Sequence, residues 1–137
     1  MNVSFSIIEP ESVAYLPQQA LAYLENGLKS SPTSDLTLNE LIDLAKNGLG
    51  DIIVVSFDSK IVGAGYYQVA EGYEGKILGI VTLGGDNFSE WQQQIYDFTV
   101  ELAKKRGCGQ IILITRVGWG RVFPDLQAVG TVFRLRV

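Results

Sequence analysis

The stretch DNFSEWQQQIYDFTVELAKKRGCG, residues 86–109, constrains the fold of this chain more than any other. Its large apolar side chains fall three and four residues apart on one stripe: Phe88, Trp91, Ile95, Phe98 and Leu102. Asn87 and Glu90 stand where side chains cap a first helical turn, and Gly107 stands where a helix ends. The stripe predicts a long helix with one buried face. The apolar run QIILIT that follows, residues 110–115, predicts a central strand of a sheet.

Two more helices are expected nearer the N-terminus. Residues 12–30 place apolar side chains at helical spacing, and Pro17 must lie near the first turn or at a break. The stretch SSPTSD that follows is expected to be a loop. In TLNELIDLAKNG, Thr37 and Glu40 have the spacing of a capping box, and Gly48 suits the position after the helix.

The remaining segments predict strands. An antiparallel hairpin with a short polar turn is expected from DIIVVSF, DSK and IVGAGYYQV, where lone glycines indicate a bulge. A loop, AEGYEG, precedes the strand KILGIVTL. The other predictions are a strand at residues 3–8, a short irregular or helical segment around WGRVFPDL, and a C-terminal strand at 131–137 with a solvent-exposed, positively charged face.

Composition narrows the class of protein. The chain has 137 residues, 47% of them hydrophobic and 19% charged, which predicts a single domain, 1–137, with a real core. Histidine is absent, and Cys108 is the single cysteine, so no zinc site of the usual kind and no Cys–His nucleophile pair is expected. Cys108 is expected to pack as a small, semi-buried side chain. No apolar run is long enough for a membrane span, and no leader is evident, so a cytoplasmic protein is expected.

Charge is divided unevenly along the chain, whose net charge is −4. Residues 1–103 carry four basic and fourteen acidic side chains, whereas residues 104–137 carry seven basic side chains against Asp125 alone. Three of these seven, at 104–106, suit the negative end of a helix dipole. The others need solvent or an acidic partner: Arg116, Arg121, Arg134 and Arg136. The net charge of −4 argues against nucleic acid as the main partner, and the uneven division of charge predicts either solvated arginines or a patch for self-association or docking.

Five motifs carry a family resemblance, and the last four are specific together in this order and spacing: LNELIDLAKNG, KIVGAGYYQV, LGGDNFSEW, AKKRGC and RVGWGRVF. The order of elements resembles the GNAT acetyltransferase fold, and residues 36–137 resemble more closely a group of phage-encoded GNAT-like proteins. The resemblance implies an α/β (α+β) class: one GNAT-like domain with a mixed, mostly antiparallel twisted sheet and helices on both faces.

The resemblance also implies an acetyl-CoA site where the long helix begins, since unpaired amides and the helix dipole suit a diphosphate there. The corresponding stretch is TLGGDNFSEW, with candidate cofactor-binding residues Leu83, Gly84, Gly85 and Asn87. The family signature, Arg/Gln-x-x-Gly-x-Gly/Ala, is incomplete, because its basic or glutamine lead and its second glycine are missing. Asp86, Asn87 and Glu90 would cap the same amides and repel the anion, so weak or absent binding of acetyl-CoA is expected. The alternative is a plain strand-to-helix turn.

Catalytic groups of the family type are not evident. The family often uses a tyrosine on the short helix after the fifth strand to protonate the leaving thiolate, but no tyrosine follows Tyr96. Phe123 on the short segment cannot donate a proton. KILGIVTL contains no glutamate to act as a base, and Glu71 and Glu74 beside it are expected to be solvated in a loop. The catalytic residues are therefore unknown, and no metal is expected.

The segment RVGWGR, residues 116–121, has two compatible interpretations. Trp119 between two glycines can close the end of the core, which would make it a structural residue. Arg116 and Arg121 on either side can instead clamp a phosphate, a carboxylate or a protein partner.

Two functions follow from the resemblance. The first is an acetyl-CoA-dependent N-acyltransferase with a degenerate cofactor loop. The second is a non-catalytic phage protein, because short-tailed phages use GNAT-like proteins of about this size to assemble internal virion components. Either would be cytoplasmic in the host cell, and the second would be virion-associated, with phage proteins or a second copy as partner.

Overall fold

The computed structural model describes residues 2–30, 36–113, 125–130 and 135–137. Along the chain the elements are β1 (Val3–Ile8), a 3-10 helix η1 (Pro10–Tyr15), α1 (Gln18–Ser30), α2 (Leu38–Lys46), β2 (Asp51–Phe57), β3 (Lys60–Gly72), β4 (Gly75–Gly85), α3 (Phe88–Lys105) and β5 (Gln110–Leu113).

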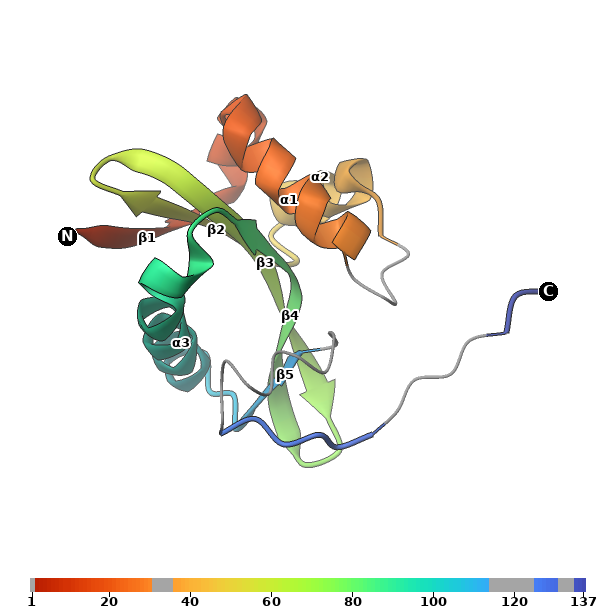
Figure 1. The fold of residues 1–137 in the computed structure, drawn as a ribbon. Coiled ribbons are helices and arrows are strands. Elements are labelled where there is room, and N and C mark those ends of the chain that lie inside the picture. The colour runs from red at the N-terminus through yellow and green to blue at the C-terminus, as the bar shows by residue number, and fades with distance from the viewer. Residues whose placement is uncertain (1, 31–35, 114–124, 131–134) are drawn as a thin grey trace.

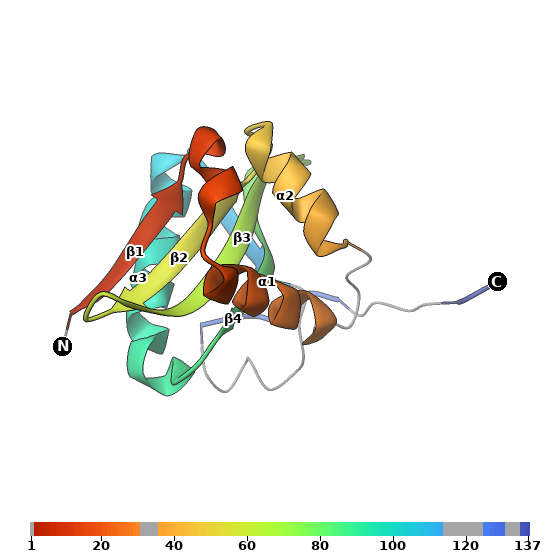
Figure 2. The same ribbon diagram turned by 90° about the horizontal axis from the view of Figure 1, so that it is seen from above.

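The five strands form one sheet in the order β1-β2-β3-β4-β5. The first four are antiparallel to their neighbours, and β5 runs parallel to β4. Helices α1 and α2 lie on one face of the twisted sheet, and α3 lies on the other (Figure 1; Figure 2). The predicted class, a mixed and mostly antiparallel sheet with helices on both faces, is confirmed.

The helices follow their sequence signals closely. The expected break at Pro17 separates η1 from α1, and the capping box of α2 is present, with Thr37 and Glu40 bonding each other's backbone amides. Gly48 follows the C-cap with φ of +71°, and Gly107 has φ of +74° at the end of α3, so both glycines take the left-handed backbone predicted for them.

The β2–β3 hairpin also matches its prediction, with a turn at Asp58 and Ser59, both of which have positive φ. The predicted loop AEGYEG is wrong: β3 continues to Gly72 and β4 resumes at Gly75, so only two residues form the turn. Gly75 has φ of +124°, a backbone conformation that lets the chain reverse at once. Glycine-rich sequence therefore marks a tight turn here and not a long loop.

A β-bulge in β4 changes which side chains face α3. Tyr66 lies opposite Thr82 and Tyr67 opposite Ile80, so Val81 is an extra residue in β4. Ile80 and Leu83 consequently both pack on the α3 side. The bulge expected in the glycine-containing strand β3 is present in its pairing with β2: Val55 lies opposite Gly63 and Ser56 opposite Ile61, so Val62 is the extra residue.

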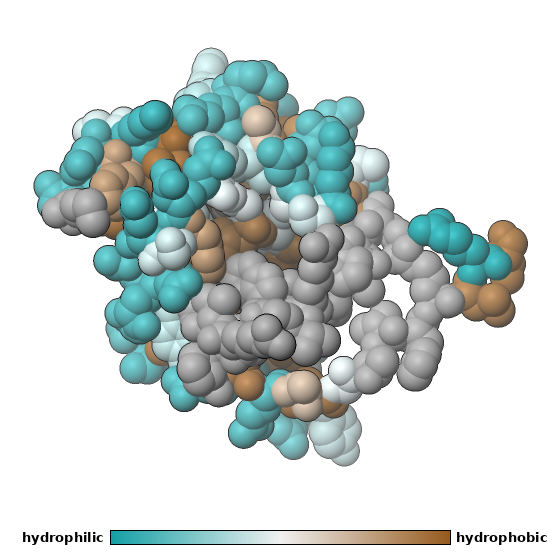
Figure 3. All heavy atoms as spheres, viewed as in Figure 1, coloured by the Kyte–Doolittle hydropathy of each residue, from teal (hydrophilic) through white to brown (hydrophobic). Residues whose placement is uncertain are grey.

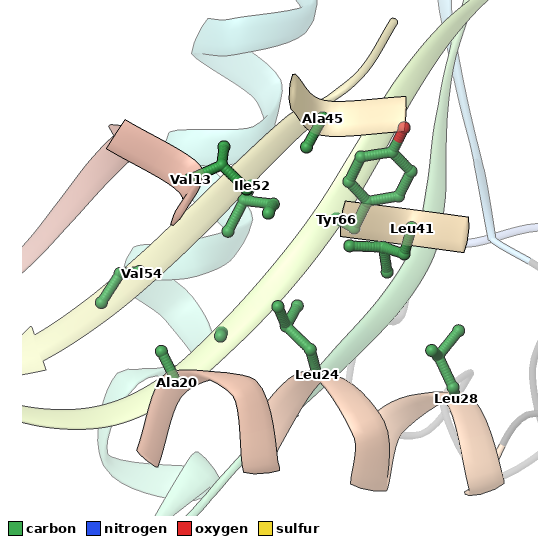
Figure 4. Packing of buried hydrophobic residues seen from close by; sticks show 10 residues of the cluster. Val13, Ala20, Leu24, Leu28, Leu41, Ala45, Ile52, Val54 and Tyr66 are labelled. Atoms are coloured by element: carbon green, nitrogen blue, oxygen red, sulfur yellow. The ribbon is translucent and has the colours of Figure 1, made fainter. Parts of the chain in front are cut away.

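Apolar residues fill both sides of the sheet. On the α1 side, Figure 4 shows side chains of α1, α2, β2 and β3 pointing toward one another, and the buried cluster contains Val13, Ala20, Leu24, Leu28, Leu41, Ala45, Ile52, Val54, Ala64 and Tyr66. On the α3 side the predicted stripe is confirmed: Trp91, Ile95 and Leu102 are buried against the sheet, and Phe88 and Phe98 are half-buried beside them. Cys108 is half-buried beside this second core, as expected.

The structure differs from the predictions for the C-terminal part of the chain or does not describe the segments concerned. QIILIT was expected to be a central strand, but β5 is the edge of the sheet among the described residues. Its apolar side chains are nevertheless half-buried, because α3 and β4 lie against it. Of the expected closing strand, 131–134 lie outside the described residues, and 135–137 are exposed and form no strand. The expected loop at 31–35, and 114–124 with most of the expected short helix, also lie outside them.

Candidate functional site

The connection from β4 to α3, where the cofactor loop was expected, consists of Asp86 and Asn87 alone. Both backbone groups of Asp86 are engaged inside the protein. Its amide donates to the Val62 carbonyl at 2.8 Å, and its carbonyl accepts from the Trp91 indole nitrogen Nε1 at 2.8 Å. The connection therefore has few backbone amides to offer a diphosphate.

The two glycines before this connection are packing positions. A Cβ atom on Gly84 would collide with the carbonyl oxygen of Tyr23 in α1. A Cβ atom on Gly85 would lie 2.5 Å from the Val62 carbonyl oxygen and 2.7 Å from the Trp91 ring. The absence of side chains here is thus explained by close contacts within the protein. A role for Gly84 and Gly85 in cofactor binding stays a prediction.

The start of α3 is acidic but is not capped as expected. Asn87 has a left-handed backbone, with φ of 55°, and its side chain makes no capping hydrogen bond. A capping side chain normally needs extended backbone at this position, which explains the failure. The Asp86 carboxylate accepts a 2.7 Å hydrogen bond from the Tyr23 hydroxyl, and Glu90 lies in the first turn of α3. Burial and this carboxylate raise the pKa of Tyr23.

A cavity of about 180 Å³ lies between α3 and strands β3, β4 and β5. Its lining is almost entirely apolar and comprises Tyr67, Ile80, Leu83, Ile95, Tyr96, Thr99, Val100, Ile111, Leu113 and Leu126. Figure 3 shows hydrophobic residues near the middle of the view, with mostly hydrophilic residues above them and to their left. The bulge at Val81 places both Ile80 and Leu83 at this cavity, a consequence that strand alternation in the sequence does not predict.

The buried hydroxyl groups of Thr99 and Tyr67 at the cavity are hydrogen-bonded within the protein. The hydroxyl of Thr99 donates to the Ile95 carbonyl at 2.7 Å, and it lies 3.0 Å from the Tyr67 hydroxyl, which must therefore donate to it. Burial raises the pKa of Tyr67 to about 12, so this hydroxyl stays protonated at neutral pH.

Tyr96 brings a third hydroxyl to the cavity wall. It donates a 3.3 Å hydrogen bond to Oδ2 of Asp125, and its pKa is raised by burial and then by that carboxylate. No carboxylate or amine is among the lining residues that the structure describes. Glu71 and Glu74 are exposed at the β3–β4 hairpin, Glu71 in a strand and not in the loop expected from the sequence.

Other predicted contacts are only partly visible. Arg116, Trp119 and Arg121 lie outside the described residues, as do Phe123 and Arg134. At the end of α3, Arg106 pairs with Asp51 of β2 at 3.0 Å, and Arg136 is exposed. Within the described ranges, no group of three or more potential ligands is placed to hold a metal ion. No helix of the described part is both long and apolar enough to cross a membrane.

No protein-family model matches the sequence, and no curated protein matches it by sequence. Solved structures do match. The chain is similar to a GNAT family acetyltransferase from Staphylococcus aureus, with a TM-score of 0.69 and 14% identity over 100% of both chains. It is also similar to the ribosomal-protein-alanine N-acetyltransferase from Brucella melitensis biovar Abortus, with a TM-score of 0.71 and 12% identity over 99% of both chains.

A third structure is a predicted acetyltransferase from Clostridium acetobutylicum with acetyl-CoA. Its TM-score is 0.70 and its identity 14%, over 98% of this chain and 96% of that one. The three likenesses show that the chain has the fold of GNAT acetyltransferases. At these identities they show the fold alone.

Proposed function

We propose that the protein is an acyl-CoA-dependent N-acyltransferase. The observation that carries this proposal is an apolar cavity beside the end of β4, on the fold of GNAT acetyltransferases. Among the described residues, the pairing of β4 with β5 ends at Ile80, whereas β4 itself continues to Gly85. An extended ligand that binds along β4 would use the backbone amides and carbonyls of this strand. The amide-containing arm of an acyl-CoA has the matching groups.

The reaction needs little from protein side chains. A neutral amine attacks the thioester carbonyl, the new N–C bond forms, the C–S bond breaks, and the proton lost by nitrogen ends on the departing sulfur. A thiol has a pKa of about 8.5, so its thiolate is a competent leaving group that water can protonate. Holding amine and thioester in line therefore supplies the main part of the acceleration. An enzyme that works by positioning alone is consistent with a cavity whose described lining residues include no carboxylate.

The donor is expected to bind weakly through its diphosphate. The connection ahead of α3 has two residues, the Asp86 amide is already bonded to Val62, and Asp86 and Glu90 place negative charge at the helix start. Each of these features disfavours an anion at this helix N-terminus. We infer that contacts to the thioester arm contribute more to binding than contacts to the nucleotide.

The alternative function expected from the sequence requires that this connection does not bind the donor. A phage-encoded GNAT-like protein that no longer binds a cofactor could use the fold for virion assembly or for docking. The C-terminal arginines would then face an acidic partner or a second copy of the chain. This alternative depends on the failure of donor binding.

Calorimetric titration with CoA and with acyl-CoA separates the two functions. The transferase proposal expects saturable binding of acyl-CoA and release of free thiol on addition of an amine acceptor. The acceptor panel should include peptides with a free N-terminus and small polyamines, because the acidic body of the protein attracts cations. Absence of both binding and thiol release would overturn the transferase and leave the docking protein.

A further inference from the structure

The cavity against α3 has a size and a chemistry that restrict what can fill it. Its volume is about 180 Å³, and a dry apolar cavity of about 150 Å³ is known to hold a benzene molecule. An acetyl group alone would leave most of this space empty. A void lined by aliphatic side chains costs stability, so a matching occupant would be bound favourably.

The polar groups of the cavity do not call for a polar ligand. Tyr67 donates to the Thr99 hydroxyl, which donates in turn to the Ile95 carbonyl, and Tyr96 donates to Asp125. A polar occupant would lose its water and gain few hydrogen bonds in return. The occupant that suits this lining is a hydrocarbon group.

The position of the cavity connects it with the donor. Ile80 and Leu83 line it from β4, whose residues continue to Gly85. Ile111 and Leu113 line it from β5. A thioester laid along the end of β4 would therefore have the cavity within reach of its acyl carbon chain.

We propose that this cavity is an acyl pocket and that the donor carries an apolar acyl group of about benzene size, such as hexanoyl or benzoyl, in place of acetyl. The inference rests on the proposed function, since it names the donor class of that reaction. In the transfer step the acyl group keeps its carbon skeleton, so the pocket selects the donor without taking part in the chemistry.

The test is calorimetric titration of the full chain with free CoA, acetyl-CoA, butyryl-CoA, hexanoyl-CoA and benzoyl-CoA. Each methylene group that is fully buried tightens binding about fourfold. Hexanoyl-CoA has four more methylenes than acetyl-CoA, so it should bind at least about tenfold tighter even with partial burial. Benzoyl-CoA should bind with similar strength.

Two substitutions at Val100 locate the effect in the cavity. Val100→Phe fills the pocket from α3 and should remove the preference for hexanoyl over acetyl. Val100→Ala widens the same wall without steric crowding, and it should move the preference to a longer chain such as octanoyl. This second variant carries the test if Val100→Phe does not fold. Gln94→Phe adds the same ring to an exposed position of α3 and should keep the wild-type preference.

The outcomes separate this inference from the proposed function. If free CoA and acetyl-CoA bind as tightly as hexanoyl-CoA, the acyl pocket is wrong while the transferase stands. If the preference exists but neither Val100 variant changes it, the acyl group binds elsewhere and the pocket is again wrong. If no CoA derivative binds, both proposals fall.

Discussion

The hydroxyl group of Tyr23 donates a 2.7 Å hydrogen bond to Oδ2 of Asp86, and this contact joins α1 to the connection ahead of α3. It keeps a carboxylate beside the helix N-terminus, where GNAT enzymes are expected to receive a diphosphate. The helix dipole favours an anion at this end, and the protein supplies one of its own. Competition between this acidic start and an anionic ligand leads to the first prediction.

Glu90→Gln should tighten the binding of CoA. The substitution removes a negative charge from the first turn of α3 and leaves the Tyr23–Asp86 hydrogen bond in place. Charges near a helix end contribute about 0.3–1 kcal/mol, so the gain should be about twofold to fivefold. It should shrink as salt is raised from low to physiological ionic strength. Calorimetric titration measures both effects.

Glu101→Gln is the matched control, because it removes the same charge near the other end of α3. An equal gain in both variants would mean that net charge acts on CoA and that the helix start does not.

Alanine at Gly84 or Gly85 should destabilise the protein. A Cβ atom at either position meets backbone of α1 or β3, or the Trp91 ring, and overpacking of this kind costs about 1–3 kcal/mol. Urea denaturation measures the free energy of unfolding. Gly79→Ala in the same strand is the control, since its Cβ would meet only the Gln68 carbonyl oxygen at 3.6 Å. Unchanged stability together with weaker CoA binding would restore the cofactor role of the two glycines.

The fold could be predicted where local chemistry decides the structure. The apolar stripe from Phe88 to Leu102 specifies a helix, and the capping box of Thr37 and Glu40 specifies where another helix begins. The glycines after two helices specify where those helices end. Each of these signals comes from residues that are close together in the sequence. The AEGYEG loop was mistaken because glycine is compatible with both a loop and a two-residue reversal. Only the pairing of β3 with β4 decides between these alternatives.

The candidate site depended on contacts that sequence cannot show. The glycines at 84 and 85 resemble a ligand loop by composition, and their constraint, the carbonyls of Tyr23 and Val62, comes from distant segments. Two cavity-lining residues, Ile80 and Leu83, share one face because a single extra residue, Val81, shifts the alternation of β4. A one-residue shift moves every later side chain to the other face, and the periodicity of the strand gives no warning of it.

The substitution Tyr67→Phe should make the free energy of unfolding depend less strongly on pH in the alkaline range. The pKa of folded Tyr67 is raised to about 12, above the ordinary value of about 10 that it regains on unfolding. Between these values the folded state holds more protons, so the stability from this group is full below about pH 10 and is lost as pH rises toward 12. The loss is about 2 to 3 kcal/mol for two pKa units.

Urea denaturation at a series of pH values between 8 and 12 measures this slope. Tyr73→Phe is the control, because Tyr73 is fully exposed at the β3–β4 turn. If the free energy of unfolding falls with pH as steeply in Tyr67→Phe as in the wild type, then Tyr67 does not cause this pH dependence.

Tyr96→Phe should leave any acyl transfer nearly intact, within about threefold, because the proposed reaction assigns no proton to this group. The Tyr96 hydroxyl lies at the cavity wall, but its proton is directed to Asp125, and its raised pKa makes it a weaker acid than an ordinary tyrosine. The measurement is the rate of thiol release with hexanoyl-CoA and a peptide amine, compared between wild type, Tyr96→Phe and the exposed-site variant Tyr15→Phe. A positioned general acid contributes about a hundredfold or more. If Tyr96→Phe lowers the rate of thiol release by that factor while the free energy of unfolding is unchanged, then Tyr96 is the proton donor and the catalytic acid lies on α3.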